Sequence, residues 1–375
     1  MRPTWRVAGA VVLFMVLEWY GATSEVSWLF LLAAWVAAMV GVAAVYAYWN
    51  RGGLTLRLAV ENVQASPQSP VHELPEQVLR AAPYAALVFE GDSFDLCVGL
   101  DTRRKEVGPA WVRGKVGNLD LALGAGVVTR KGWSRHRALR SLRRSTITAT
   151  GWAIHSGDPL GFFASAKTCA DAEVGLVYPR FASLAGRRRP HELETTAAAP
   201  RAGPGTELFG VREYSPGDSL RRIHWRSSAR HGQLVVREYE PPGFETLAIY
   251  VDPAPKGDRV ADQIARIAAS EAWDCLRNGG RAALWAPGLR ASFLGDGRNL
   301  WALLDWLTRF PGEPGDDPAP AASEAVVITA TPDPRLTDAL EGARRRGARA
   351  RAWVVGDAEL DLDFDVQRAG LEWPL

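Results

Sequence analysis

The segment between Glu207 and Glu240 holds the densest set of residues that could carry chemistry. Within it Arg222, Arg226 and Arg230 recur every four residues, so a helix would place their three guanidinium groups on one stripe. Guanidinium groups bind carboxylate or phosphate through paired hydrogen bonds. The spacing therefore predicts either an anion site or a seam of ion pairs.

Two interpretations of this arginine stripe stay open. In the favoured one, Glu213, Glu238 and Glu240 on flanking strands pair with the arginines and lock two domains together. In the other, the arginines and His231 receive a phosphate or the carboxylate of a partner. A concave, solvent-open cluster without acidic partners would support the second interpretation, and internal pairing would support the first.

A hydrolytic triad in this segment is disfavoured. Asp218, His224 and either Ser227 or Ser228 are suitable residue types. However, three such residues on one short helix cannot easily converge on a common point. We therefore predict no catalytic residues and no enzymatic activity.

Local signals predict how the segment folds. Residues 208–214 read as a strand, and Ser215, Pro216 and Gly217 form a turn. Asp218 can cap a helix that runs to about residue 228, because its carboxylate accepts from the free amides of the first turn. A second strand is expected at residues 233–239.

The run R-E-Y-S-P-G-D-S-L-R-R-I-H-W-R-S-S-A-R, at residues 212–230, resembles the hallmark of the domain-of-unknown-function 58 (DUF58) family. The D-P-L-G-F-F run at 158–163 resembles the family's D-P-F-G-L-F, and residues 177–180 resemble its V-Y-P-R. This resemblance covers most of the chain. It implies an architecture but no reaction, because the family has no settled activity. The signature residues, with an interaction or a structural role, are Arg212, Glu213, Tyr214, Pro216, Gly217, Asp218, Arg222, Trp225, Arg226, Ser228 and Arg230.

Beyond residue 245, apolar strands alternate with amphipathic helices. This order requires right-handed crossovers and a parallel sheet that is covered on both faces. The DUF58 resemblance implies that the unit has a von Willebrand factor type A-like fold. The pattern places strands at 246–251, 282–285, 325–329 and 350–355, and helices at 259–277, 300–310 and 335–346.

A type A fold often binds Mg²⁺ through a D-x-S-x-S sequence after its first strand, because this hard cation prefers oxygen ligands. Here Asp252 begins the stretch D-P-A-P-K, so Ala254 and Lys256 replace the two serines. We therefore predict no metal and no cofactor at this degenerate site. Asp252 is expected to cap a turn or the following helix, or to contact a partner.

The first fifty residues differ from the rest of the chain in composition, because they are mostly apolar and contain few charged residues. Residues 26–48 carry none, and a helix of this length covers roughly 35 Å, enough to cross a bilayer. Residues 7–20 supply a second span interrupted by Glu18, which predicts a transmembrane hairpin. A buried core helix is disfavoured because it would rarely be apolar all round. A cleaved signal peptide is disfavoured because bulky Trp19 and Tyr20 occupy the cleavage region.

The basic residues near the spans predict the orientation. Arg2 and Arg6 precede the first span, Arg51 and Arg57 follow the second, and the connection between them has no Lys or Arg. Basic residues favour the cytoplasmic side. We therefore expect a cell-membrane protein with two membrane helices and cytoplasmic soluble domains.

The middle of the chain reads as strands. Apolar and polar residues alternate at 54–60 and again at 94–100, which predicts an antiparallel β-sandwich-like domain. The isolated Cys97, Cys169 and Cys275 fit a reducing compartment. None has the close Cys or His neighbour in sequence that a structural zinc site needs.

Composition excludes a general attraction to nucleic acid, because the net charge is only +2. The three arginines at 187–189 lack interleaved aromatic residues, so nucleic-acid binding is disfavoured there too. Residues 191–206 are rich in Ala, Pro and Gly, which predicts a linker.

These patterns predict an α+β multidomain protein. Residues 1–50 form the transmembrane hairpin, 51–190 the β-sandwich-like domain, 191–206 the linker, and 207–375 the signature segment with the type A-like α/β domain. We expect a membrane-anchored, non-enzymatic interaction or scaffold protein whose partners include the lipid bilayer but no nucleic acid. The resemblance implies a MoxR-type AAA ATPase as protein partner, in assembly or activation of other complexes. The alternative is an anion-binding regulator or enzyme at the membrane that uses the signature arginines.

Overall fold

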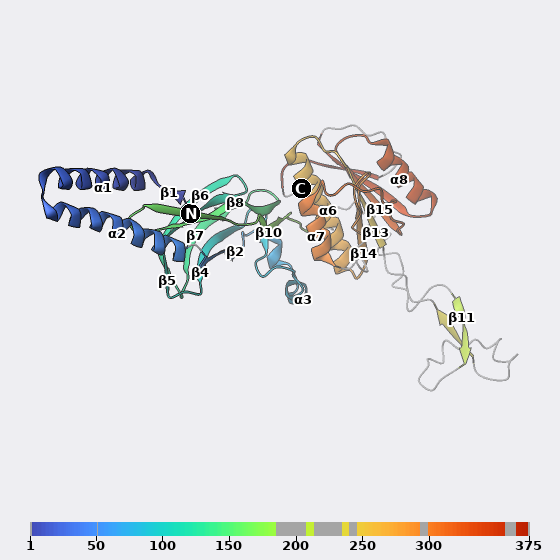
Figure 1. The fold of residues 1–375 in the computed structure, drawn as a ribbon. Helices are drawn as coiled ribbons and strands as arrows, with labels where there is room; N and C mark the ends of the chain where they lie inside the picture. The colour runs from blue at the N-terminus through green and yellow to red at the C-terminus, as the bar shows by residue number, and fades with distance from the viewer. Residues whose placement is uncertain are drawn as a thin grey trace. The chain divides into compact units, whose positions relative to one another are not determined.

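The computed structural model describes residues 2–50, 52–184, 208–213, 235–239, 246–292, 299–356 and 365–373 (Figure 1). The chain forms two compact units, Met1–Arg180 and Phe181–Leu375. Residues 181–184 pack within the second unit, where the Leu184 amide donates to Asp274 Oδ2 at 2.8 Å. The expected linker at 191–206 lies outside the described residues, and the division into four parts stays a prediction.

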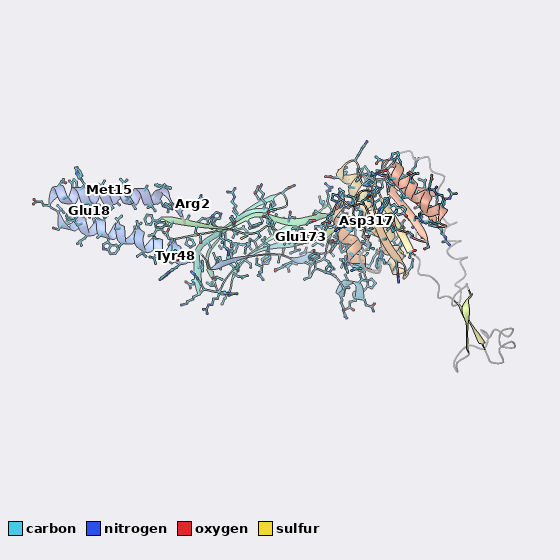
Figure 2. All side chains as sticks on the ribbon, turned by 45° about the vertical axis from the view of Figure 1, so that its right-hand side comes forward. Arg2, Met15, Glu18, Tyr48, Glu173 and Asp317 are labelled. Atoms are coloured by element: carbon cyan, nitrogen blue, oxygen red, sulfur yellow. The ribbon has the colours of Figure 1, made fainter. Side chains whose placement is uncertain are left out.

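Two long apolar helices, α1 (Trp5–Ser24) and α2 (Ser27–Asn50), pack against each other as a hairpin (Figure 1). Both are long and apolar enough to cross a membrane, and only 11% and 17% of the two spans are buried. Their apolar side chains therefore face outward, as Met15 of α1 does in Figure 2. The prediction of two helices that are long and apolar enough to span a membrane is therefore confirmed. Their low burial differs from that of a core helix in a soluble protein, which would be mostly buried.

The rest of the first unit contains two sheets. The smaller has the antiparallel order β2 (Leu54–Gln64), β4 (Ser93–Thr102), β7 (Trp133–Arg140). The larger has seven strands, of which only β10 and β3 pair in parallel. A 3₁₀ turn, η1 (Pro70–His72), and a short helix, α3 (Glu76–Arg80), follow β2. The path of the larger sheet is β1 (Arg2–Pro3), β9 (Phe163–Thr168), β8 (Ser145–Gly157), β10 (Ala172–Tyr178), β3 (Val88–Phe89), with β5 (Glu106–Val116) beside β8 and β6 (Leu119–Thr129) beside β5.

The two sheets share one hydrophobic core. Leu96 and Val98 enter it from β4, and Val112 and Trp152 enter it from β5 and β8. The Trp152 ring lies over Gly114, where any added Cβ would collide with it. Burial alternates along β2 and most of β5, as the period of two in the sequence predicts, whereas residues 96–100 of β4 are all buried.

The second unit contains a five-stranded parallel sheet. Helix α8 (Pro334–Arg345) covers one face, where Leu336 and Leu340 pack against Ala248 and Tyr250. Helices α6 (Asp258–Arg277) and α7 (Leu300–Arg309) lie on the other face (Figure 1). The strand order is β14 (Arg281–Trp285), β13 (Thr246–Val251), β15 (Glu324–Thr329), β16 (Arg349–Val355), β17 (Asp365–Ala369).

This mixed α/β organisation confirms the expected alternation of strands and helices. The edge strand β17 was not expected, because its sequence D-V-Q-R-A contains no apolar run. Its pairing with β16 is decided by the sheet rather than by local propensity.

Candidate functional site

Asp252 follows directly after β13, beside the end of β15. Only 1% of the residue is exposed. Its Oδ2 accepts hydrogen bonds from Thr331 Oγ1 at 2.8 Å and from the Ala330 and Thr331 amides at 3.2 Å, and lies 3.1 Å from the Thr329 hydroxyl. Its Oδ1 accepts from the Ala254 amide at 3.0 Å. Donors of the same chain therefore surround both carboxylate oxygens.

These contacts give Asp252 a structural role. The bond from the Ala254 amide, two residues further on, closes an Asx turn. The hydrogen bonds of Oδ2 connect that turn to the segment after β15. Helix α6 begins later, after Gly257, so Asp252 caps a turn and not this helix. Lys256 is exposed and brings an ammonium group into the same stretch. The absence of a metal and a cofactor here stays a prediction.

A second polar cluster lies inside the same unit, around Arg351 of β16. Its guanidinium donates to both oxygens of Glu271 at 2.5 and 2.6 Å and to Glu324 at 2.6 Å, and Trp353 Nε1 donates to Glu271 at 2.7 Å. Burial alone would lower the pKa of Arg351, but the charges and hydrogen bonds of the two glutamates raise it above its ordinary value. These contacts join α6 to β15 and β16.

Sequence reasoning missed this cluster, although one signal was available. Glu271 lies on α6 among apolar residues, and it is fully buried. A carboxylate at such a helix position needs a buried partner, because an unpaired charge is costly away from water. The partner on β16 could not be identified from spacing.

The D-P-L-G-F-F segment at 158–163 connects β8 and β9. Asp158, which is 2% exposed, accepts the Leu160 amide on Oδ1 at 2.9 Å and the Phe163 amide on Oδ2 at 2.6 Å. The carboxylate thereby fixes the loop from the inside, which gives this resembling motif a structural explanation.

Both membrane-capable helices are attached to this loop and to the sheets. Phe162 packs against Ala10 of α1 and Ala43 of α2. The Thr4 amide, just before α1, donates to the Phe162 carbonyl at 2.8 Å. Asn50, the last residue of α2, donates its side-chain amide to a carbonyl of β5 at 2.6 Å and to the last carbonyl of β8 at 3.1 Å. The two ends of the hairpin therefore meet at the same end of the β structure.

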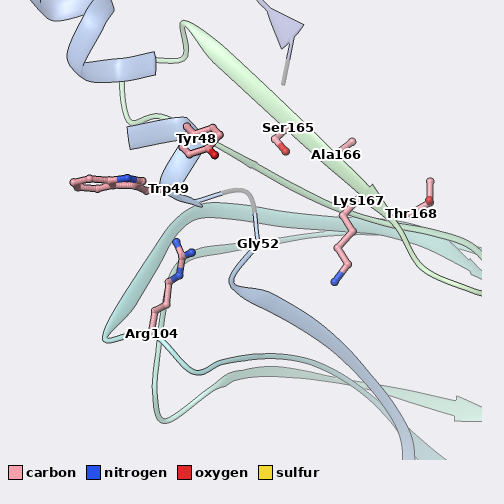
Figure 3. Close-up of a pocket in the computed structure, with 8 residues that line it drawn as sticks. All are labelled: Tyr48, Trp49, Gly52, Arg104, Ser165, Ala166, Lys167 and Thr168. Atoms are coloured by element: carbon pink, nitrogen blue, oxygen red, sulfur yellow. The ribbon is translucent and has the colours of Figure 1, made fainter. Parts of the chain in front are cut away.

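A pocket of about 670 Å³ opens beside the end of α2 (Figure 3). Arg104 reaches it from the turn between β4 and β5, and Lys167 reaches it from β9. Within the described part of the chain, neither cation has a carboxylate at ion-pair distance, and Lys167 Nζ contacts only the Leu54 carbonyl at 3.5 Å. The lining residues are Tyr48, Trp49, Gly52, Arg104, Ser165, Ala166, Lys167 and Thr168.

Glu61, Cys97 and His136 meet on the face of the smaller sheet that points away from the core. Cys97 of β4 lies directly opposite His136 of β7, and Glu61 is on β2. Burial raises the pKa of the Cys97 thiol, and the negative charge of Glu61 raises it further. Sequence reasoning missed this group because strand register, and not spacing along the chain, brings the three residues together.

The described part of the signature comprises Arg212 and Glu213, which end β11 (Leu208–Glu213). This strand pairs antiparallel with β12 (Val235–Tyr239), which confirms the two expected strands. The expected helix from Asp218 lies outside the described residues, so ion pairing and anion binding both stay open. Also outside are the signature residues Tyr214, Pro216, Gly217, Asp218, Arg222, Trp225, Arg226, Ser228 and Arg230, together with His231 and Glu240.

Residues 210–358, from β11 to just beyond β16, match the model of the family described as protein of unknown function DUF58. These residues are similar to the DUF58 family, and the match covers less than half of the chain. The uncharacterized protein YeaD of Bacillus subtilis (strain 168) is similar to the chain, with 25% identity over 138 residues. The match covers 36% of this chain and 34% of YeaD, so the chain spans about a third of the length of this curated relative.

The DUF58 match divides the sites described above into two groups. The β11–β12 pair, Asp252 and the Arg351 cluster lie within the DUF58 region. The helix hairpin, the pocket beside α2 and the group around Cys97 precede it. The second group therefore belongs to a part of the chain that the family match does not cover.

Proposed function

We propose that the chain is a membrane-anchored, non-enzymatic interaction protein that presents a degenerate von Willebrand factor type A-like domain to a protein partner. The observation that carries this proposal is the set of donors around Asp252. Ligands of open α/β sheets usually bind at the carboxyl ends of the strands. There the buried Asp252 accepts from the Thr331 hydroxyl and from backbone amides. A carboxylate held in this way shapes a rigid surface and is poorly placed to act as a base.

The partner that we propose is a MoxR-type AAA ATPase, with which the chain acts in assembly or activation of other complexes. Two features support this proposal. The parallel sheet with helices on both faces is compatible with the type A-like fold that the DUF58 resemblance implies. The DUF58 resemblance also implies the partner, because relatives of such ATPases commonly work with proteins that carry type A domains.

Co-purification tests the partnership. The full chain in detergent is mixed with a purified MoxR-type ATPase, with and without a non-hydrolysable ATP analogue. We expect retention in the nucleotide-bound state and its loss in Arg222→Ala and Arg226→Ala. Arg345→Ala removes an exposed arginine of α8 and serves as the matched control. Absence of retention in every nucleotide state would contradict the proposal. Phosphate binding that is lost in Arg222→Ala would favour an anion-binding regulator or enzyme.

We also propose that both helices span the cell membrane and that the soluble domains, which are the rest of the first unit and the second unit, are cytoplasmic. The contacts of Thr4 and Asn50 support this topology, because they hold the two ends of the hairpin at the same end of the β structure. Arg2 and Arg6 add basic charge at that end. A fluorescent protein fused after Leu375 should fluoresce, as expected for a C-terminus in the cytoplasm. Activity of alkaline phosphatase at the same position would contradict the orientation.

A further inference from the structure

The pocket beside α2 lies where a spanning helix would leave the hydrocarbon. Helix α2 has 24 residues and is therefore about 36 Å long, against about 30 Å for the hydrocarbon core. Tyr48 and Trp49 of its last turn are 67% and 66% exposed and line the pocket. Aromatic side chains of this type sit at the level of the lipid headgroups. The pocket would then open among those headgroups.

Donors of two separate elements converge on this pocket. In Figure 3, Arg104 extends from its turn toward Trp49, and Lys167 projects from β9. Both cations are exposed, and within the described residues no carboxylate neutralises them. Ser165 and Thr168 line the same space and add hydroxyl groups. A guanidinium, an ammonium and hydroxyl donors together suit the oxygens of a phosphate group.

We propose that this pocket binds the phosphate of an anionic phospholipid, with Arg104 and Lys167 as the charged contacts. The proposal rests on the membrane insertion proposed above. A lipid is favoured over a soluble phosphate because aromatic residues of the bilayer-facing α2 form one side of the pocket, so acyl chains can continue along that helix. The bound lipid would hold the turn between β4 and β5 against the membrane surface.

Lipid retention measures this binding. The full chain is reconstituted in nanodiscs of phosphatidylcholine with a rising share of phosphatidylglycerol, and retained lipids are counted by native mass spectrometry. We expect preferential retention of phosphatidylglycerol. Arg104→Gln and Lys167→Gln should each lower it about fivefold, as about 1 kcal/mol per basic residue near a membrane implies. Arg103→Gln and Lys105→Gln remove exposed charges from the same turn without lining the pocket, and they should leave it unchanged.

Three outcomes would overturn the proposal. Equal losses in the Arg103 and Lys105 controls would mean diffuse attraction to the surface. Displacement by inorganic phosphate at equal concentration would mean a site for soluble phosphate. A chain that is released from membranes by alkaline carbonate lacks the anchor altogether, and this measurement, made first, separates failure of anchoring from failure of the lipid site.

An independent observation concerns Glu61, Cys97 and His136. His136 Nδ1 lies 3.9 Å from Glu61 Oε2, and one donor atom from each of the three residues lies within 4.8 Å of the others. In a tetrahedral zinc site with bonds of about 2.0–2.3 Å, the ligand atoms are about 3.4–3.6 Å apart. Three paired strands carry these residues, so the backbone already holds them side by side, and side-chain rotation has to close the remaining difference in spacing.

We infer that this group binds Zn²⁺ through Cys97 Sγ, His136 Nδ1 and a carboxylate oxygen of Glu61, with water as the fourth ligand. Thiolate and imidazole are preferred zinc ligands. The His136 side chain is 43% exposed and gives the ion access, while Cys97 lies beneath it. The Cys97 thiol proton leaves to solvent as the metal–sulfur bond forms, so one proton is released per ion bound.

Cobalt is a direct probe of this site. The full chain in detergent is stripped of metal and titrated with Co²⁺, and we expect a near-ultraviolet thiolate-to-cobalt band that Zn²⁺ abolishes. Cys97→Ser should remove the band, and the matched control Cys169→Ser should keep it. His136→Gln, at an exposed position, should weaken binding by about tenfold or more. Absence of the band in the wild-type chain, or its persistence in Cys97→Ser, would overturn the inference. Far-ultraviolet circular dichroism verifies the fold of each variant.

Discussion

At Asp252, donors from Ala254, Ala330 and Thr331 converge on one buried carboxylate. Asp252→Asn keeps the shape but turns an amide NH₂ toward these donors. We expect it to lower the free energy of unfolding by about 2–3 kcal/mol, because bonds to a charged group are lost and donors stay unpaired. Chemical denaturation of the full chain in detergent measures this change.

The control for Asp252 is Asp305→Asn on α7. Asp305 is partly exposed and pairs with Arg309 one turn along the helix, so its loss should cost no more than about 0.5 kcal/mol. If Asp252→Asn were as stable as this control, the carboxylate would be dispensable for folding and its role would lie in contact with a partner.

Asp333 provides a pH-dependent residue-scale prediction. It caps α8 by accepting the Arg335 amide at 2.9 Å, and its Oδ2 lies 3.0 Å from Arg335 Nη2. Burial alone would raise the pKa of Asp333, but the hydrogen bonds and charge of Arg335 lower it below its ordinary 3.8. A group with a lowered folded-state pKa stabilises the protein above its unfolded pKa, and this contribution is lost as pH falls through the folded value.

Asp333→Ala should therefore lower the free energy of unfolding by about 1 kcal/mol at neutral pH. The difference from the wild-type chain should shrink as the pH falls below 3.8. Urea unfolding in steps from neutral to acid pH tests both statements. A difference that stays constant throughout would show that the charge of the cap is unimportant.

At the scale of elements, Arg351 and Glu271 join β16 to α6. Arg351→Met should cost about 3–5 kcal/mol, because it removes the cation that neutralises the buried Glu271 carboxylate. Arg351→Met combined with Glu271→Gln removes both charges but keeps an acceptor for Trp353, so it should recover more than half of that loss. A double-mutant cycle measured by denaturation gives the coupling. Additive effects would contradict the account of the pair as one unit.

Gly161 lies at the junction between the hairpin and the sheets. Its φ is 75°, and an added Cβ would lie 2.6 Å from the Arg6 guanidinium of α1. Gly117 also has a positive φ, 55°, but a Cβ there meets nothing within 4 Å. Alanine at either site should cost about 1–2 kcal/mol for the left-handed backbone. In addition, Gly161→Ala should displace the Arg6 side chain and make the backbone of the loop at 158–163 more accessible to solvent.

Hydrogen exchange of the full chain in detergent separates the two effects. We expect faster exchange in the 158–163 loop and the first turn of α1 for Gly161→Ala but not for Gly117→Ala. Identical exchange in the two variants would mean that Arg6 moves aside without loosening the junction.

In the whole molecule, the hairpin covers an apolar residue of the loop between β8 and β9. Phe162 packs against Ala10 and Ala43, so a variant without residues 2–50 loses these contacts. We expect it to bind a hydrophobic dye and to aggregate, and Phe162→Ser in the same variant should reduce dye binding. The full chain should stay in membranes after alkaline carbonate. A shortened chain that is soluble and binds no dye would contradict this account of the junction.

Much of the fold was predictable because its signals are local. The uncharged stretch at 26–48 indicated α2, and alternation around Leu96 and Val98 indicated β4. Even the strands that flank the signature were expected where β11 and β12 lie. In contrast, the expectation that no cysteine has a metal-binding neighbour considered only sequence spacing, and strand pairing placed His136 beside Cys97.

Most of the helices and strands and their apolar faces, though not β17, could be predicted from the sequence, because burial free energy follows a period that a short window of residues displays. The neighbours of Asp252, Glu271 and Cys97, in contrast, depend on the tertiary structure. Asp252 meets Thr331 across 79 residues, and Glu271 meets Arg351 across 80. Such contacts depend on strand order and register, which arise from the packing of all the elements together and leave no trace in local spacing.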